Sequence, residues 1–150
     1  MVSVAIFDYG AGNIFSLKNS LEQAGASVDV ITSFDKPNVY SGLLLPGVGN
    51  FDPAMKSINE NSKTKFQDFV KTDTPVLGIC LGMEMFFEKS EEGIEKGFNV
   101  IDGEIVVLPS TMKVPHMGWN NLEIKKPGTI LEGVDEGSWV YFVHSYRAKP

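Results

Sequence analysis

Short apolar runs that end at glycine turns recur through the first half of the chain. Residues 2–7 stop before a Gly10-Ala11-Gly12 turn, and residues 42–45 stop at Pro46-Gly47-Val48-Gly49. Residues 75–79 form a third run of this kind. Each run is too short for a helix, so the pattern predicts buried strands that lead into glycine loops.

Between these strands the apolar positions change to a helical spacing. Ile14, Leu17 and Leu21 recur at steps of three and four residues. This spacing predicts an amphipathic helix, with Asn13 as its N-cap and Gly25 as a left-handed stop.

The alternation continues along the chain. A strand is expected at residues 27–32, Asp52 followed by proline is the expected cap of a second helix, and Phe66 with Phe69 marks another helical face. A last apolar helix is predicted through residues 80–87. The repeated order of strand, loop and helix predicts an α/β fold with a doubly wound, mostly parallel sheet covered on both faces.

The pattern changes in the second half. Residues 104–108, 119–124 and 139–146 are predicted strands without intervening helices. The charged residues 88–96 before them are interpreted as the solvated end of a helix. No linker or repeat divides the chain, which favours one domain of 150 residues with a strand-rich second half.

Composition then narrows the classes of function. Nineteen acidic and 13 basic residues give a formal charge of −6, so no positive field exists to attract nucleic acid or an anionic membrane surface. No apolar run approaches membrane-spanning length. One cysteine and two histidines are too few for a structural zinc site or an internal disulfide. These counts predict no metal and a reducing, cytoplasmic compartment.

The two glycine loops do not have the pattern of nucleotide sites. Phe15 and Asp52 stand where the third glycine of a dinucleotide fingerprint belongs, and neither loop carries the lysine of a P-loop. No cofactor is therefore expected.

A nucleophile motif surrounds the single cysteine. Gly78-Ile79-Cys80-Leu81-Gly82 has the form of a nucleophile elbow, in which flanking glycines let a strand turn sharply into a helix and expose the central side chain. At a helix N-terminus the Cys80 thiol is expected to favour its thiolate. A small buried hydrophobe is the alternative for a lone cysteine. The preceding strand and both glycines favour the nucleophile.

An acyl-transfer nucleophile needs backbone N–H groups directed at the developing oxyanion. The Gly47-Val48-Gly49 loop follows another predicted strand, so it is expected to face Cys80 and to supply one donor, with Leu81 supplying a second. A plain turn is the alternative for this loop.

A thiol nucleophile also needs a base, and His116 and His144 are the two histidines of the chain. His116 is expected in a rigid, proline-bounded surface loop. His144 lies in a predicted apolar strand, where a histidine is more often a paired core group than a catalyst. Spacing alone does not choose between them.

Taken together, these motifs resemble the class I glutamine amidotransferases. The resemblance rests on the Cys80 elbow, the Pro46-Gly47-Val48-Gly49 loop and the segment Pro115-His116-Met117-Gly118-Trp119-Asn120. It is strongest to the glutaminase subunits of imidazole glycerol phosphate synthase and covers nearly the whole chain. Further matches lie at residues 8–13, 80–87 and 142–147.

This resemblance implies a flavodoxin-like fold and a reaction of histidine biosynthesis. Cys80 attacks the side-chain amide of glutamine, ammonia leaves, and the glutamyl thioester is hydrolysed to glutamate. The ammonia passes to a cyclase subunit with the fold of a (βα)₈ barrel, within a heterodimer. The roles that it implies fall into three groups: oxyanion binding by Gly47, Val48 and Gly49; glutamine binding by Glu92, His144, Ser145 and Tyr146; and contact with the cyclase by Asn13, Met117, Trp119 and Tyr141.

Two departures from the family pattern stand out. Glu84 occupies the position of a substrate-contacting glutamine, which adds a carboxylate near the site. The His-Pro-Glu motif that completes the family's catalytic triad is not found after Tyr146, and His144 matches a different family position. The expectation is that this chain lacks the C-terminal part of the domain with the triad histidine and glutamate.

Two other functions stay open. The missing triad members favour a non-catalytic module that docks on the cyclase. Alternatively, a thiol-dependent hydrolase or redox protein of the same fold would use Cys80 without amide chemistry.

Overall fold

The computed structural model describes residues 2–35 and 39–150. Its internal contacts divide the chain into two compact units. The first comprises Met1–Val106 with Ala148–Pro150, and the second comprises Val107–Arg147.

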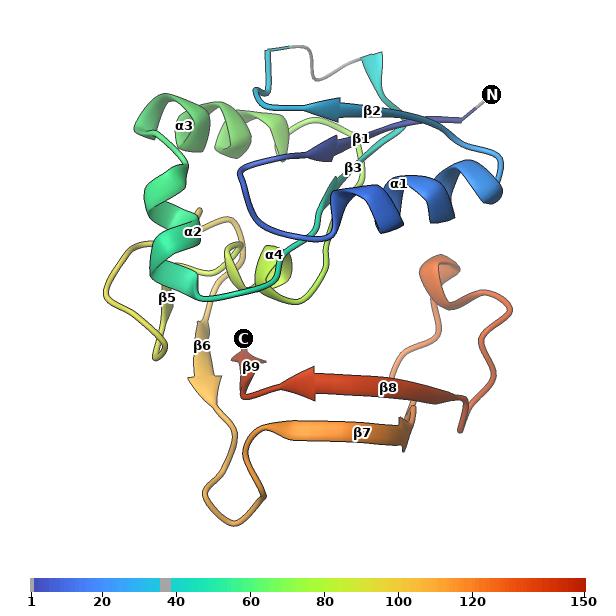
Figure 1. Ribbon diagram of the computed structural model, residues 1–150, viewed down its shortest axis with the longest axis vertical. Coiled ribbons are helices and arrows are strands. Elements are labelled where there is room, and N and C mark those ends of the chain that lie inside the picture. Colours follow the sequence, from blue (N-terminus) through green and yellow to red (C-terminus); the bar gives the residue numbers. More distant parts are fainter. Residues whose placement is uncertain (1, 36–38) are drawn as a thin grey trace. The chain divides into compact units, whose positions relative to one another are not determined.

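A four-stranded parallel sheet forms the centre of the first unit (Figure 1). Its strands lie in the order β2-β1-β3-β4. Their bounds are β1 Ser3–Phe7, β2 Ser27–Ile31, β3 Gly42–Leu45 and β4 Val76–Gly78. All three pairings are parallel, and Leu45 of β3 is the register partner of Gly78 of β4. The predicted parallel sheet is confirmed, and the carboxyl ends of β3 and β4 lie at the same edge.

Four helices accompany this sheet: α1 Ile14–Gln23, α2 Phe51–Ser57, α3 Glu60–Phe69 and α4 Leu81–Glu84. Helix α1 packs Ile14, Leu17 and Leu21 against the cluster of Val4, Ile6, Val28 and Leu44. Because side chains alternate along a strand, Phe7 of β1 points to the opposite face. There its ring lies 4.1 Å from that of Phe34, which in turn contacts Phe66 of α3. Helices thus cover both faces, as predicted.

Helix α4 is shorter than the helix predicted through residue 87. It ends at Glu84, and the next turns are closed by tighter bonds from Phe86 N–H to the Met83 carbonyl and from Phe87 N–H to the Glu84 carbonyl. The side chains of Phe86 and Phe87 are buried. Apolar periodicity predicted their burial correctly but not the end of the helix.

The charged segment 88–96 is not the end of a helix, so that prediction is wrong. Lys89–Ser90 forms strand β5, which pairs in parallel with β6, Glu104–Val107. Ser90 is buried in this pairing. A second sheet has the order β5-β6-β9, where β9 is Tyr146–Lys149. Strand pairing between distant segments overrides the local charge pattern.

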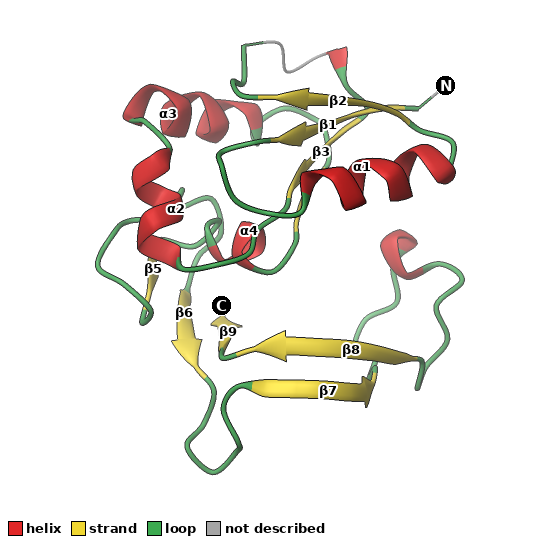
Figure 2. Ribbon diagram, in the orientation of Figure 1, coloured by secondary structure: helices red, strands yellow, loops and turns green. Residues whose placement is uncertain are grey.

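An antiparallel ribbon dominates the second unit (Figure 2). Strand β7, His116–Asn121, pairs with β8, Trp139–His144, and Thr129–Leu131 forms a short 3₁₀ helix between them. Both strands were predicted, but β7 begins three residues earlier than expected. In the described part of the chain, no helix combines the length and the apolar character needed to cross a bilayer.

Candidate active site

A sharp turn between β4 and α4 presents Cys80 at the surface. Its backbone has φ 55° and ψ −119°, and such a conformation costs a non-glycine residue about 1–3 kcal/mol. The Cys80 carbonyl accepts the N–H groups of Met83 at 2.9 Å and Glu84 at 3.1 Å, which starts the helix. Cys80 is exposed, so it is not a buried core residue. Strand, strained turn and helix form the geometry of a nucleophile elbow.

The two glycines of the elbow are required by close backbone packing. A Cβ at Gly82 would overlap the carbonyl oxygen of Leu45, and a Cβ at Gly78 would lie 2.5 Å from the Cα of Met83. Neither backbone group can move aside without shifting its strand or helix. These contacts bring α4 close to β3 and β4 and fix the direction of the turn.

The surroundings of Cys80 raise the pKa of its thiol. Partial burial of the sulfur is the largest cause, and the negative charges of Glu84 and Glu92 add to it. The hydrogen bond from the Leu81 N–H acts in the opposite direction. The expected preference for thiolate is therefore wrong for this arrangement, because burial and the two carboxylates outweigh the hydrogen bond from the Leu81 N–H. The thiol needs a base.

The glycine loop after β3 lies beside the elbow, as expected for neighbouring parallel strands. A Cβ at Gly47 would lie 2.6 Å from the Gly82 nitrogen and 2.7 Å from the Leu81 Cβ. Gly47 is buried, whereas Val48 and Gly49 are exposed. Gly49 has φ +105°, with open space around an added Cβ. The start of the loop is thus packed against the backbone that follows Cys80, and the middle of the loop is exposed to solvent.

Tyr9 is a residue of this region that the sequence analysis did not identify. Its hydroxyl donates a 2.5 Å hydrogen bond to the Pro46 carbonyl. Burial is the main cause that raises the pKa of Tyr9, and the charge of Cys80 acts in the same direction. The hydroxyl therefore remains protonated and a donor. Its place just after β1, the strand beside β3, was the available signal.

Two segments meet at the start of α2. A Glu92 carboxylate oxygen, Oε2, accepts the N–H of Phe51 at 2.8 Å. Asp52 does not cap the helix as predicted, because its Oδ1 accepts the N–H groups of Ile94 and Glu95, each at 2.9 Å. Asn50 occupies the N-cap position, with no side-chain capping bond. The carboxyl of Glu84, the other acidic residue of the predicted site, is buried on α4.

The two histidines form a pair in the second unit. They are register partners on β7 and β8, and His116 Nδ1 lies 3.0 Å from His144 Nε2. His144 Nδ1 lies 2.8 Å from the Tyr146 carbonyl, which only accepts, so His144 donates there. His116 thus lies in a strand and not in the expected loop. Neither histidine is assigned as the base.

The remaining predicted site residues lie at the start of α1 and in the second unit. The Ser145 carbonyl accepts the Leu108 N–H at 2.9 Å, and Ser145 and Tyr146 are half-buried. Asn13 caps α1, because its side chain accepts the Ser16 N–H at 3.2 Å. The remaining partner-facing candidates share one outer face of the β7–β8 ribbon and are exposed: Met117, Trp119 and Tyr141.

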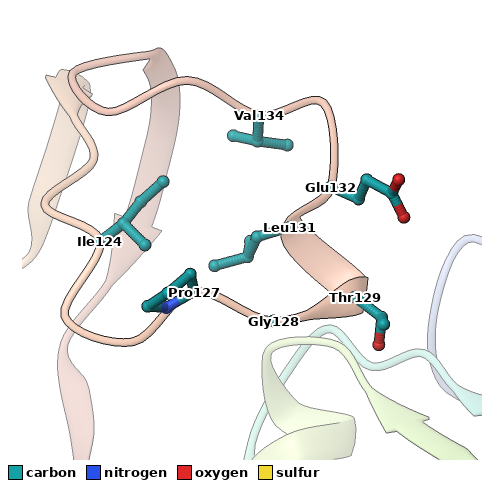
Figure 3. A pocket seen from close by; sticks show the side chains of 7 residues that line it. All are labelled: Ile124, Pro127, Gly128, Thr129, Leu131, Glu132 and Val134. Atoms are coloured by element: carbon teal, nitrogen blue, oxygen red, sulfur yellow. The ribbon is translucent and has the colours of Figure 1, made fainter.

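A pocket of about 310 Å³ in the second unit holds none of the predicted site residues. Figure 3 shows Ile124, Leu131 and Val134 directed toward one another within it. Its other lining residues are Pro127, Gly128, Thr129 and Glu132. This lining offers no thiol and no imidazole. Across residues 2–35 and 39–150, no group of three or more His, Cys, Asp or Glu side chains is arranged to hold a metal ion.

Sequence comparisons identify close relatives. Residues 5–150 match the family of class I glutamine amidotransferases. The chain is 44% identical over 148 residues to the imidazole glycerol phosphate synthase subunit HisH of Aquifex aeolicus, covering 97% of this chain and 72% of that protein. The corresponding subunit of Geobacillus kaustophilus is 44% identical over 157 residues, covering 98% and 73%. That of Cyanophora paradoxa is 39% identical over 153 residues, covering 99% and 71%.

Solved structures share the fold. The structure of PurLQS from Thermotoga maritima superposes with a TM-score of 0.71 at 17% identity, covering 99% of this chain and 69% of that one. The crystal structure of a glutamine amidotransferase has a TM-score of 0.68 at 15% identity, covering 95% and 70%. At these identities the likeness concerns the fold alone.

Proposed function

Because this chain belongs to the class I glutamine amidotransferases, and among them to the HisH subunits of imidazole glycerol phosphate synthase, we propose that Cys80 is its nucleophile. The chain is the glutaminase subunit of an enzyme of histidine biosynthesis. The observation that carries the role of Cys80 is its exposed side chain on a strained turn between a parallel strand and a helix.

The chemistry follows from the state of the thiol. A base removes the proton that the raised pKa retains on Cys80. The thiolate attacks the side-chain carbonyl carbon of glutamine, and the tetrahedral intermediate collapses as the amide nitrogen takes a proton and leaves as ammonia. Water then attacks the glutamyl thioester, which releases glutamate and restores the thiol. Cysteine serves because sulfur is both a strong nucleophile and a good leaving group.

The oxyanion of the intermediate needs donors on one side of Cys80. The Leu81 N–H already forms a hydrogen bond to the Cys80 side chain. The Gly47-Val48-Gly49 loop supplies the other donor in this proposal, supported by its contact with the Leu81–Gly82 backbone. Removal of one such donor typically costs 10²–10³ in rate, so this loop carries a large share of catalysis.

Binding of the substrate is assigned to two sets of groups. Glutamine carries a charged α-amino and an α-carboxylate group. The carboxylates of Glu84 and Glu92 suit the ammonium, and His144, Ser145 and Tyr146 are assigned to glutamine because they match the family positions that hold the substrate. Support comes from the electrostatic effect of Glu84 and Glu92 on Cys80.

The partner in this proposal is a cyclase with the fold of a (βα)₈ barrel, in a heterodimer. Support comes from the outer face of the β7–β8 ribbon, where Met117, Trp119 and Tyr141 are 62%, 67% and 55% exposed. Trp119 and Tyr141 form an edge-to-face pair at 5.6 Å. Exposed aromatic residues in one patch are typical of binding hot spots. Asn13 is also assigned to contact with the cyclase. A cytoplasmic location completes the proposal, since an exposed free thiol suits a reducing compartment.

Substitution of the nucleophile tests the proposal. In the protein assembled with its cyclase, Cys80→Ala is expected to lower the release of glutamate from glutamine by at least about 10³-fold. Synthesis of product from added ammonia is expected to continue, because the cyclase and its docking surface are unchanged. Glutamate release at the normal rate by Cys80→Ala would contradict the proposal.

A second function is favoured by one observation. The pKa of the Cys80 thiol is raised, so the thiol needs a base. The two histidines of the chain are bonded to each other. A docking module without catalysis would fit this arrangement. Measurement of glutamate release by this 150-residue chain with the cyclase separates the two: Cys80-dependent turnover excludes the docking module.

A further inference from the structure

The glycine loop beside Cys80 is held firmly at its start. The Tyr9 hydroxyl binds the Pro46 carbonyl at 2.5 Å, and Gly47 is packed against the Leu81–Gly82 backbone. No side chain could be added at position 47 without displacing these groups. The first anchor of the loop therefore lies at Pro46 and Gly47.

A second anchor lies where the loop enters α2. The Phe51 N–H donates to Glu92 at 2.8 Å, so the 90–95 segment holds the first residue of the helix. In the reverse direction, Asp52 of the helix accepts the N–H groups of Ile94 and Glu95. Each segment thus supplies a carboxylate to the backbone of the other. Charge-assisted bonds of this kind are about twice as strong as neutral ones.

Two further contacts support this reciprocal arrangement. A Cβ at Gly93 would overlap the Asp52 carboxylate, so the segment can approach α2 this closely only with glycine there. Lys56 of α2 forms an ion pair with Glu95 at 3.6 Å. The hydrogen bonds from Glu95 and Ile94 hold the pKa of Asp52 below its usual range. The carboxylate form is therefore present at neutral pH.

We propose that Asp52 is a positioning residue for the reaction at Cys80. The bonds from Ile94 and Glu95 to Asp52, together with the bond from Phe51 to Glu92, form a clamp that fixes the end of the glycine loop. This inference rests on the proposed function of that loop as an oxyanion donor. Between the two anchors lie Val48, Gly49 and Asn50, all exposed. Because both ends of the loop are held, the position of these three residues and of their donor depends on both anchors. Asp52 itself is not among the groups that shift the pKa of Cys80, which leaves geometry as its route of action.

Substitutions at Asp52 test the clamp in the protein assembled with the cyclase. Asp52→Ala removes all its acceptor oxygens and is expected to lower kcat for glutamine hydrolysis about tenfold, because misplaced donors cost one to two orders of magnitude. Asp52→Asn keeps one acceptor oxygen and is expected to lose less activity. Asp68→Ala removes an equally charged side chain from an exposed site on α3 and serves as the matched control, with unchanged kcat.

Two other measurements separate positioning from simple loss of folding. Alkylation of Cys80 by iodoacetamide needs no oxyanion donor, so its rate is expected to stay at the wild-type value in all three variants. Hydrogen exchange at the amides of Phe51, Ile94 and Glu95 is expected to accelerate in Asp52→Ala only. General unfolding would instead remove the burial and the two carboxylates that raise the pKa of Cys80, so faster alkylation together with lower turnover would overturn the inference.

The inference and the proposed function fail in different ways. Wild-type kcat in Asp52→Ala, in a protein whose activity requires Cys80, overturns the positioning role alone. Glutamate release that does not require Cys80 overturns the proposed function and this role together. Unchanged exchange at Ile94 and Glu95 in Asp52→Ala overturns the clamp itself, whatever the activity.

Discussion

Two properties of Cys80 oppose each other at the scale of a single residue. Its side chain is exposed on a strained turn, which suits a nucleophile, yet burial of the sulfur and two carboxylates raise the pKa of the thiol. A raised pKa keeps the proton on sulfur at neutral pH. Reactivity toward an electrophile should therefore increase with pH well beyond the range in which an ordinary thiol is already ionised.

Removal of one negative charge should make the thiol more acidic. Glu84→Gln is expected to lower the pKa of Cys80, because a neutral amide no longer disfavours the neighbouring thiolate. The rate of iodoacetamide labelling, measured from pH 6 to 10, should then rise at lower pH than in the wild type. Glu88→Gln, which removes a carboxylate from an exposed ion pair with Lys96, is the control. Identical pH profiles for wild type and Glu84→Gln would refute this electrostatic account.

How far the sequence predicts the site depends on the range of the interaction. The place of Cys80 on a strand-to-helix turn follows from its two glycines, which are local. The charge of Glu92 reaches Cys80 only because the fold returns that segment to the start of α2. Tyr9 and Asp52 have partners 37 and 42 residues away, so no local pattern reveals their contacts.

At the scale of elements, the approach of α4 to β3 determines the elbow. Gly82→Ala is expected to destabilise the protein by about 3 kcal/mol, because the new Cβ would overlap the Leu45 carbonyl and force the helix away. Urea unfolding followed by circular dichroism measures this difference. Gly128→Ala is the control, since Gly128 has extended backbone and open space around an added Cβ. Equal losses in both variants would show that α4 does not require the close approach.

Elements with a strong internal pattern were predicted well. Three of the four parallel strands, β1, β3 and β4, are short apolar runs that lead into glycine turns, and α1 has both its cap and its stop in the sequence. The failures share one cause. Helix α4 ends early, β5 replaces a helix end, and β7 begins at His116, each because pairing or packing with distant segments decides the outcome.

At the scale of the whole molecule, acid should destabilise the first unit. Asp35, Asp52 and Glu104 all have a pKa below the usual range, mainly through the Lys65 side chain, the Glu95 N–H and the Lys89 side chain respectively. A carboxyl with a lowered pKa stabilises the folded state above its unfolded pKa, and the contribution disappears as pH falls through the folded pKa. The stability should therefore decrease from about pH 5 downward.

Thermal unfolding measured between pH 3 and pH 7 checks this expectation. The Tm should be nearly constant from pH 7 to pH 5 and then fall. Glu104→Gln should lessen the fall, because that carboxyl no longer binds a proton on unfolding. A Tm that is independent of pH down to 3 would contradict the role of these carboxylates.

The outer face of the β7–β8 ribbon also determines the intrinsic tryptophan fluorescence of this protein. The chain has two tryptophans, Trp119 and Trp139, and both are exposed on that face, at 67% and 66%. Emission excited at a wavelength selective for indole should therefore be that of a solvated fluorophore and should shift to the blue when a partner covers the ribbon. The parallel sheet around Cys80 contains no indole, so its unfolding should be nearly silent in this signal while circular dichroism records it.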